Sequence, residues 1–532
     1  MKRTFILFVF SFFCLVDIQA QNRGDLLNYE LIADKTPGEI DDLLSGSTGI
    51  PSIFLGFLIP TTFDVQVYKL TYSTTDGNGN KTIATGAAYI PKPYPCDAPL
   101  AAYLHGTIID EASVPSNLVG VEGTIGWAMA TDGYVAALPD YIGLGDSPGA
   151  HPYVHSATEA SASIDMMRAT RHLCSILGAG LNGQVFISGY SQGGHSTLAT
   201  QREIERNHRS EFNLQFVAAG AGPYDLSGTQ KDFAFNNDFY PNPSFLPYVL
   251  EGYERIYGNI YNTRSDIYVA PYDEQIPILL DGSLSVEEID ALLPANWKSI
   301  FQPDYLNGVE NDYYNPVNVA LRKNNLYAWS PRTTTRLYYC TSDEQVDPAN
   351  SVVAWWNFFL RGAGWRTAAV PLGPFMHRDC APIALLVGKA KFDGYRNDRN
   401  CNRNARKVIT DLTVDNEQLK PLVNEVDIPD LATQLRNVGR ADLAAIVDQE
   451  DISTQLKLYP NPASSVTTLD FSGLNEEVRE VKISDTSGKL IRAMPVAGQP
   501  GKLTLDIQDL PAGMYIITVE ASEQYYLNLI KD

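Results

Sequence analysis

The sequence predicts an α/β domain, built on a mostly parallel sheet with helices on both faces, followed by a small all-β sandwich. Short apolar runs at 100–104, 135–138 and 185–187 are separated by stretches with helical periodicity, such as 158–176. Strands buried on both faces of a parallel sheet have this continuous apolar character. From residue 455 the pattern changes to alternating stretches around 465–471, 478–494 and 502–530, which is typical of a sandwich.

The first 20 residues have the pattern of a secretory signal peptide. Lys2 and Arg3 precede an apolar run over 5–16, and Ile18-Gln19-Ala20 forms a cleavage site before Gln21. No other stretch reaches the length of a membrane-spanning helix. We therefore expect an exported protein without an integral membrane segment.

Composition narrows the partners of the chain. Its 532 residues leave room for two or three domains, and its net charge of −22 argues against nucleic acid and anionic membranes. The mature chain has no C-x-x-C pair, so zinc and redox motifs are not expected, and we expect no metal and no cofactor. Export permits one or two disulfides, whose pairing stays open among Cys96, Cys174, Cys340, Cys380 and Cys401.

An antiparallel hairpin is expected before the parallel strands. The alternating run 63–70 and the run 81–90 flank the turn Asp76-Gly77-Asn78-Gly79-Asn80. This turn has oxygen ligands at alternate positions, as a calcium loop does, but Ala87 stands where such a loop needs its acidic twelfth residue. A tight turn is the interpretation that remains.

The segment around Ser191 predicts a nucleophilic serine. The strand-like run 185–188 leads into Gly189-Tyr190-Ser191-Gln192-Gly193, a G-x-S-x-G pentapeptide, and helix formers follow. Strand, sharp turn and helix form the context of a nucleophile elbow, in which Gly189 and Gly193 avoid collisions with neighbouring backbone. The serine then lies at a helix N-terminus, where a developing negative charge is favoured.

Three segments together resemble an α/β-hydrolase of the secretory lipase and esterase type, over about residues 50–400. They are His105-Gly106-Thr107 after one strand, Asp140 to Ser147 after the next, and Gly189 to His195. The resemblance implies an oxyanion hole made by the backbone N–H groups of Thr107 and Gln192. The side chains of His105 and His195 are interpreted as structural.

The chain order of the family, serine then acid then histidine, directs the search for the other two catalytic residues. Asp343 follows the strand-like run 335–340 and matches the acid of the family, with Glu344 and Asp347 as lower-ranked candidates. Of the seven histidines only His377 lies beyond Asp343, in an expected loop after the strand 367–372. His377 would then take the proton of Ser191, and Asp343 would orient the imidazole.

The region between the catalytic segments is expected to form a lid at about residues 223–334, inside a hydrolase domain spanning 21–402. This segment is rich in tyrosine and also holds Trp297 and Trp329. Its aromatic side chains suit an acyl groove or an aromatic or sugar-bearing substrate, and packing of the lid's own core is the alternative. Residues 403–454 are expected to be a helical or linker segment.

The module at 455–532 resembles the type A sorting domain of the type IX secretion system. The resemblance rests on Tyr459-Pro460-Asn461-Pro462, on Leu510 to Tyr515 and on the final segment from Tyr526 to Asp532. It implies a Bacteroidota exporter, the type IX machinery as a partner, and a location outside the cell or at its surface. A carbohydrate-binding or adhesive sandwich is the alternative.

The sequence thus predicts a secreted serine hydrolase that cleaves carboxylic esters through an acyl-enzyme. A serine peptidase of the same fold is one alternative, and a surface binding protein on an inactive hydrolase scaffold is another. The acyl chain, the alcohol and the oligomeric state are left open.

Overall fold

The computed structural model describes residues 22–47, 61–94 and 97–397, and in the C-terminal part 457–459, 465–472, 478–485, 490–496, 501–510, 513–521 and 524–531. The expected signal peptide at 1–20 and the expected helical or linker segment at 403–454 lie outside the described residues. The chain divides into two compact units, Met1–Val426 and Asp427–Asp532.

The first unit is built on a nine-stranded sheet with the order β1-β2-β3-β5-β4-β6-β7-β8-β9. The strands β1 (Leu26–Lys35), β2 (Asp64–Thr75) and β3 (Lys81–Lys92) pair antiparallel, and β3 also pairs antiparallel with β5 (Val135–Pro139). The expected hairpin is therefore confirmed, whereas β1, whose side chains are largely exposed, was not anticipated.

The parallel part of the sheet runs from β5 to β9. It contains β4 (Ala98–Leu104), β6 (Leu181–Tyr190), β7 (Asn213–Gly220), β8 (Thr334–Tyr339) and β9 (Thr367–Pro371), paired in parallel register. Since the carboxyl ends of parallel strands meet at one edge, the segments that follow β4, β6, β8 and β9 come together there. These segments carry the residues expected to be catalytic.

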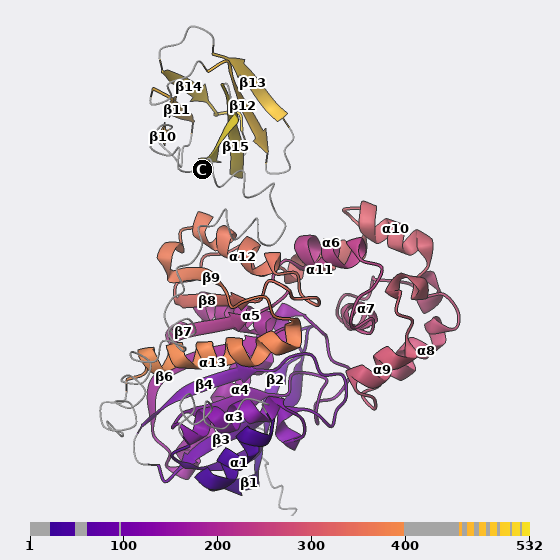
Figure 1. Ribbon diagram of the computed structural model, residues 1–532, viewed down its shortest axis with the longest axis vertical. Coiled ribbons are helices and arrows are strands. Elements are labelled where there is room, and N and C mark those ends of the chain that lie inside the picture. The colour runs from indigo at the N-terminus through magenta and orange to yellow at the C-terminus, as the bar shows by residue number, and fades with distance from the viewer. Residues whose placement is uncertain are drawn as a thin grey trace, which may run out of the picture. The chain divides into compact units, whose positions relative to one another are not determined.

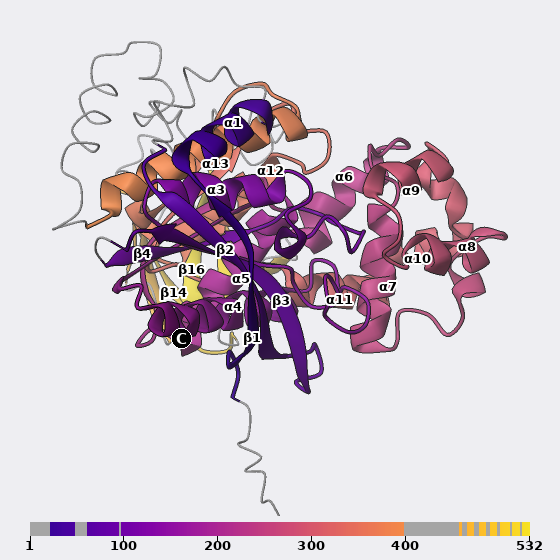
Figure 2. The ribbon, with the colours of Figure 1, turned by 90° about the horizontal axis from the view of Figure 1, so that it is seen from below.

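Helices cover both faces of this sheet (Figure 1), as the sequence predicts. On one face, α1 (Pro37–Ser47), α3 (Glu122–Thr131) and α13 (His377–Tyr395) enclose an apolar core with the sheet. On the other face, α4 (Ser156–Leu177) and α5 (Gln192–Asn207) enclose a second one. Figure 2 shows α1, α3 and α13 together on one side of the strands. The helix α12 (Ala349–Leu360) connects β8 to β9.

The segment between β7 and β8 forms a helical lid with a core of its own. It contains α6 (Lys231–Asn236), α7 (Phe245–Tyr257), α8 (Tyr272–Leu279), α9 (Val286–Leu292), α10 (Pro303–Asn311) and α11 (Pro316–Asn324). Its core includes Tyr253, Tyr268 and Trp297, so much of its aromatic content packs internally. The lid helices gather beside the sheet in both ribbon views (Figures 1 and 2).

The second unit contains two antiparallel sheets. One is ordered β10-β11-β14 and comprises Lys457–Tyr459, Val466–Asp470 and Lys502–Asp506. The other is ordered β13-β12-β15-β16 and comprises Leu490–Pro495, Glu480–Asp485, Gly513–Glu520 and Gln524–Lys531. Alternate residues such as Leu469, Val481 and Ile517 are buried in a core of this unit. None of the helices in the described parts of the chain combines the length and apolar character of a membrane span.

Candidate active site

Ser191 lies on a sharp turn between β6 and α5. Its backbone angles are φ 60° and ψ −123°, a conformation that is strained for a residue with a side chain. A Cβ atom at Gly193 would lie 1.9 Å from the carbonyl oxygen of Leu104, and one at Gly189 would lie 2.5 Å from the same oxygen. Both positions therefore require glycine, as a nucleophile elbow does.

Asp343 and His377 form a buried pair beside the elbow. His377 Nδ1 lies 2.6 Å from Asp343 Oδ2, and the two side chains are 5% and 1% exposed. Asp343 Oδ1 accepts hydrogen bonds from the backbone N–H groups of Gln345 and Val346, at 3.0 and 2.9 Å. Because both carboxylate oxygens are occupied, the carboxylate is fixed and His377 Nδ1 is its donor.

The expectation that His377 lies in a loop is wrong, because it is the first residue of α13. Its backbone N–H is one of the unpaired groups of a helix N-terminus and donates to Glu344 Oε2 at 2.9 Å. The hydroxyl group of Tyr190 donates to the carbonyl oxygen of His377 at 2.8 Å. Burial raises the pKa of Tyr190, so this hydroxyl stays a neutral donor.

The two lower-ranked carboxylates have other contacts. Glu344 contacts the backbone of His377 and not its ring. Asp347 Oδ1 accepts from the backbone N–H of Ala349 at 2.8 Å, in the first turn of α12. Of the three candidate acids, Asp343 is the one for which the structure records a bond to the imidazole.

Thr107 lies in the segment after β4, and Gln192 is the first residue of α5, directly after Ser191. Neither backbone N–H has a recorded acceptor among the described residues, so both can serve an incoming oxyanion. Thr107 Oγ1 lies 2.8 Å from the hydroxyl oxygen of Tyr153. The loop is also held by Glu122, whose carboxylate accepts from the backbone N–H of Gly106 at 3.2 Å and from the hydroxyl of Tyr103.

The histidines interpreted as structural are fully buried. His105 Nδ1 lies 2.7 Å from the carbonyl oxygen of Gly106, and Nε2 lies 3.3 Å from that of Asp140. The ring of His105 also contacts the ring of Tyr141, with 4.2 Å between the centroids. His195 contacts Glu159 and the backbone of Asn324.

A disulfide joins the two segments that carry the acid and the histidine. Cys340 directly follows β8, three residues before Asp343, and Cys380 lies three residues after His377, with 6.1 Å between the two Cα atoms. Sequence left the pairing open, and spacing alone could not have found it. Cys174 is free and buried, while Cys96 and Cys401 lie outside the described residues.

Two cavities meet at Ser191. The first, here called the lid cavity, measures about 960 Å³ to its open mouth and is walled mainly by apolar lid residues, among them Leu226, Phe235, Val249, Trp297, Phe301 and Val309. The second, here called the wide cleft, measures about 1780 Å³ and is also lined by Thr107 and His377. More polar groups line the wide cleft, including Asp110, Ser113, Glu122, Asn242, Ser285 and Glu287.

No group of side chains that could hold a metal ion is found among the described residues. The site combines a serine on a sharp turn, a histidine bonded to a carboxylate, and two backbone N–H groups with no recorded acceptor, which are the kinds of group that nucleophilic catalysis uses.

Comparison with known protein families identifies the C-terminal residues. Residues 457–531 match the secretion system C-terminal sorting domain, so the small sandwich is a sorting domain. No curated protein matches the chain.

Solved structures that resemble this chain include the following three. The rice cell wall degrading esterase LipA from Xanthomonas oryzae is 30% identical, with a TM-score of 0.62 over 70% of this chain and 100% of its own. A provisionally assigned hydrolase from Legionella pneumophila is 26% identical, with a TM-score of 0.64 over 71% of this chain and 100% of its own. Lipase A from Candida antarctica is 16% identical with a TM-score of 0.55 over 79% of this chain and 92% of its own, which shows the fold alone.

Proposed function

Since the chain belongs to the α/β-hydrolase family of esterases and lipases that includes LipA, we propose that it is a secreted serine hydrolase that cleaves carboxylic esters through Ser191, His377 and Asp343. The proposal is supported most directly by one arrangement. Ser191 on its strained turn and His377, held by Asp343 at 2.6 Å, line the same cleft.

The chemistry follows from this arrangement. Ser191 Oγ attacks the ester carbonyl carbon while His377 Nε2 takes its proton, and the carbonyl oxygen becomes an oxyanion. The backbone N–H groups of Thr107 and Gln192 stabilise that oxyanion, and each such donor contributes about 3–4 kcal/mol to the transition state. Collapse of the intermediate breaks the C–O bond of the ester, and His377 returns the proton to the departing alcohol.

Hydrolysis of the acyl-enzyme repeats the sequence with water as the nucleophile. His377 takes a proton from the water, and Ser191 leaves with that proton as the carboxylic acid forms. Asp343 keeps Nδ1 protonated throughout, so that Nε2 faces the reaction, and it stabilises the imidazolium that forms in each half-reaction. No external cofactor enters these steps.

The two cavities at Ser191 favour different parts of an ester. The apolar wall of the lid cavity suits the acyl chain, because burying each methylene group contributes about 0.8 kcal/mol. The wide cleft presents carboxylates, hydroxyl groups and an amide, which suit an alcohol moiety that has hydroxyl groups of its own. The acyl chain would thus enter the lid cavity, and the alcohol would depart through the wide cleft.

We also propose that the chain is exported in two steps. Residues 1–20 would direct it across the inner membrane, and the sorting domain would then engage the type IX secretion machinery and be removed. This proposal rests on the match at 457–531 and on the pattern of the first 20 residues.

A labelling experiment tests the proposed activity. A fluorophosphonate probe should label the wild-type protein once, on the peptide that contains Ser191, and should leave Ser191→Ala unlabelled. A panel of p-nitrophenyl esters from acetate to palmitate, with feruloyl and acetylated-sugar substrates, should then define the acyl and alcohol preferences. Labelling of Ser191→Ala at the wild-type rate, or a wild-type protein inert toward both probe and esters, would contradict the proposal.

A further inference from the structure

A buried carboxylate that the proposed mechanism does not use lies behind the elbow. Glu159 is in the first turn of α4 and is 0% exposed. Its Oε1 accepts a hydrogen bond from the side-chain amide of Gln192 at 3.1 Å, and its Oε2 lies 2.6 Å from His195 Nδ1. Gln192 and His195 both belong to the first turn of α5, directly after Ser191.

Both ring nitrogens of His195 have a partner. Nδ1 faces the carboxylate of Glu159, and Nε2 faces the carbonyl oxygen of Asn324 at 3.0 Å. Asn324 is the last residue of α11, so the ring of His195 lies between α4 and the end of the last lid helix.

The partners of Glu159 favour its ionised form. Burial alone would raise the pKa of Glu159, but the interaction with His195 and the hydrogen bonds of His195 and Gln192 hold that pKa below its ordinary value. The carboxylate, at 0% exposure, is therefore stabilised by the ring of His195 and by an amide donor.

The amide of Gln192 is also held from its other side. Its Nε2 lies 2.7 Å from His151 Nε2, and His151 Nδ1 lies 2.8 Å from the carbonyl oxygen of Ile142. His151 Nδ1 must therefore carry the ring proton, so His151 Nε2 accepts from Gln192. Burial lowers the pKa of His151 to about 4, which keeps this ring neutral and able to accept. Both hydrogens of the Gln192 amide are thus used, and its side chain has one position.

We propose that Glu159 is a positioning residue of the oxyanion hole: by holding the side chains of Gln192 and His195, it fixes the first turn of α5 and so the direction of the Gln192 backbone N–H. This inference rests on the proposed function, in which that N–H stabilises the oxyanion. Glu159 contacts His195, which in turn contacts the backbone of Asn324, so the same carboxylate also helps to hold the last lid helix, α11, against the first turn of α5.

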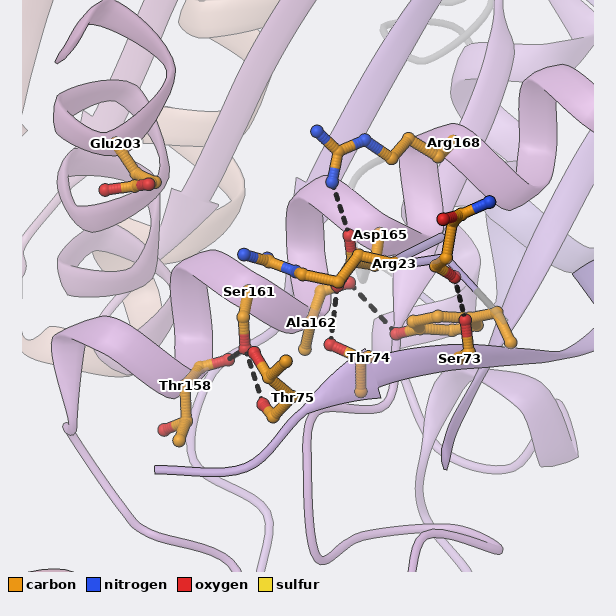
Figure 3. A network of polar contacts seen from close by, with 12 residues as sticks. Arg23, Ser73, Thr74, Thr75, Thr158, Ser161, Ala162, Asp165, Arg168 and Glu203 are labelled. Carbon is orange, nitrogen blue, oxygen red and sulfur yellow. Dashed lines mark hydrogen bonds and ion pairs between the residues drawn. The ribbon is translucent and has the colours of Figure 1, made fainter. Parts of the chain in front are cut away.

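The chain offers a matched control on the same helix. Asp165 of α4 is also a 0% exposed carboxylate with two partners of positive charge, Arg23 Nε at 3.0 Å and Arg168 Nη1 at 2.7 Å. Thr74 Oγ1 donates to it at 2.7 Å. Figure 3 shows these side chains converging on Asp165, a network that contains no residue of the candidate active site.

Three variants separate positioning from stability. Glu159→Ala and Asp165→Ala should both lower Tm, because each removes a buried carboxylate from the donor side chains that contact it. Assayed at 20 °C with p-nitrophenyl butyrate, Glu159→Ala should lose about ten- to a hundred-fold in kcat, a fraction of the loss when an oxyanion donor is removed outright. Its KM should stay within about three-fold of wild type, since the oxyanion contact is made in the transition state. Asp165→Ala should keep the wild-type kcat.

Glu159→Gln provides the rescue. Its amide can accept from Gln192 and donate to the Nδ1 of a neutral His195, so every hydrogen bond is rebuilt without charge. We expect it to recover most of the kcat lost in Glu159→Ala. If Glu159→Ala does not fold, Gln192→Met tests the positioning role in its place, because it removes the side chain that Glu159 holds but keeps the backbone N–H. Its kcat should fall by a factor similar to that expected for Glu159→Ala.

The outcomes distinguish the two proposals. The positioning role would be overturned if Glu159→Ala and Asp165→Ala had equal kcat values, or if Glu159→Gln were as slow as Glu159→Ala. If Glu159→Ala does not fold and Gln192→Met is used in its place, an unchanged kcat in Gln192→Met would overturn it. Ser191→Ala in the same assay reports on the proposed function: activity retained there would overturn both proposals, whereas its loss together with a fully active Glu159→Ala would overturn this one alone.

Discussion

Cys340 and Cys380 are joined across the Asp343–His377 pair, so that one covalent bond ties the loop after β8 to the first turn of α13. Each cysteine is three residues from one member of the pair. The closed loop spans a sequence separation of 40 residues. The hydrogen bond between acid and base is thus held within a covalently closed segment, a device that suits an exported protein.

Removing this disulfide should lower both stability and activity. Cys340→Ala/Cys380→Ala should lose about 2–4 kcal/mol in the free energy of unfolding, because the unfolded chain regains the freedom of an open loop. The kcat should also fall, since the histidine and its acid are then joined by a hydrogen bond alone. Urea unfolding and ester hydrolysis measure the two effects, with free Cys174→Ala as the control. An unchanged kcat at temperatures where the variant is folded would show that the bond stabilises the fold without bracing the pair.

The identity of the acid can be tested with three isosteric changes. Asp343→Asn should lower kcat by several orders of magnitude, because it reverses the hydrogen bond that sets the tautomer of His377. Glu344→Gln should have a much smaller effect, since it contacts the backbone N–H of His377, and Asp347→Asn should affect stability only. A crippled Asp347→Asn with an active Asp343→Asn would reassign the acid.

Serine and histidine should behave as a unit. Ser191→Ala and His377→Ala should each cost several orders of magnitude in kcat, and the double variant should be little worse than either. Additive losses in the double variant, measured with the same soluble ester, would contradict a shared role.

A bulky side chain in the lid cavity should shorten the preferred acyl chain. Val309→Trp should lower kcat/KM for p-nitrophenyl octanoate by more than about ten-fold. The larger side chain would displace a few methylene groups of the acyl chain from the cavity, and each displaced methylene loses about 1–3 kcal/mol of binding free energy. The acetate ester should change by less than about three-fold. Ile278→Trp is the control, because Ile278 is an exposed lid residue, 66% exposed, outside the cavity lining. Equal losses on both esters would place the acyl chain elsewhere.

Stability should fall on acidification through two buried histidines. Burial lowers the pKa of both His151 and His155 to about 4, whereas in the unfolded chain each titrates near 6.5. Between these values the unfolded state binds more protons, so the free energy of unfolding rises with pH by up to about 1.4 kcal/mol per unit for each histidine. Below about pH 4 both states are protonated, and this contribution levels off.

A variant pair isolates this effect in a series of unfolding curves from pH 4 to 7. His155→Gln should reduce the slope of the free energy of unfolding against pH by up to about 1.4 kcal/mol per pH unit, the contribution of one proton taken up on unfolding. His172→Gln, at an exposed position of α4, the helix that begins directly after His155, should leave the slope as in the wild type. A wild-type slope in both variants would show that His155 does not take up a proton on unfolding.

The sorting domain should take no part in catalysis. It has its own buried core, and the candidate active-site residues all lie in the first unit. A chain ending at residue 452 should therefore keep the wild-type kcat/KM on soluble esters, and in its host it should accumulate in the periplasm. The exported protein should begin at Gln21 and lack the sorting domain by mass spectrometry. Recovery of full-length protein ending at Asp532 from the medium would contradict removal of the domain.

Local sequence determined the parts of this protein that depend on the nearest neighbours along the chain. The apolar runs that become β4, β5 and β6 are buried on both faces, so their composition alone identifies them. The elbow could be read because backbone collisions at Gly189 and Gly193 impose glycine at fixed distances from the serine. The turns and alternating stretches beyond residue 455 likewise predicted a small sandwich, whereas its identification as a sorting domain came from the resemblance of its motifs to that family, which the match at 457–531 confirms.

Tertiary structure alone decided which distant side chains meet. His377 was found by chain order, but its place at the start of α13 depends on Glu344 and Tyr190, whose contacts no spacing predicts. The pairing of Cys340 with Cys380 joins segments 40 residues apart. The contacts of Glu159 with Gln192 and His195 likewise join two helices across 33 and 36 residues of chain. Hydrogen bonds and disulfides depend on distances of a few ångströms, and those distances are set by how helices pack on the sheet, which is a property of the whole fold.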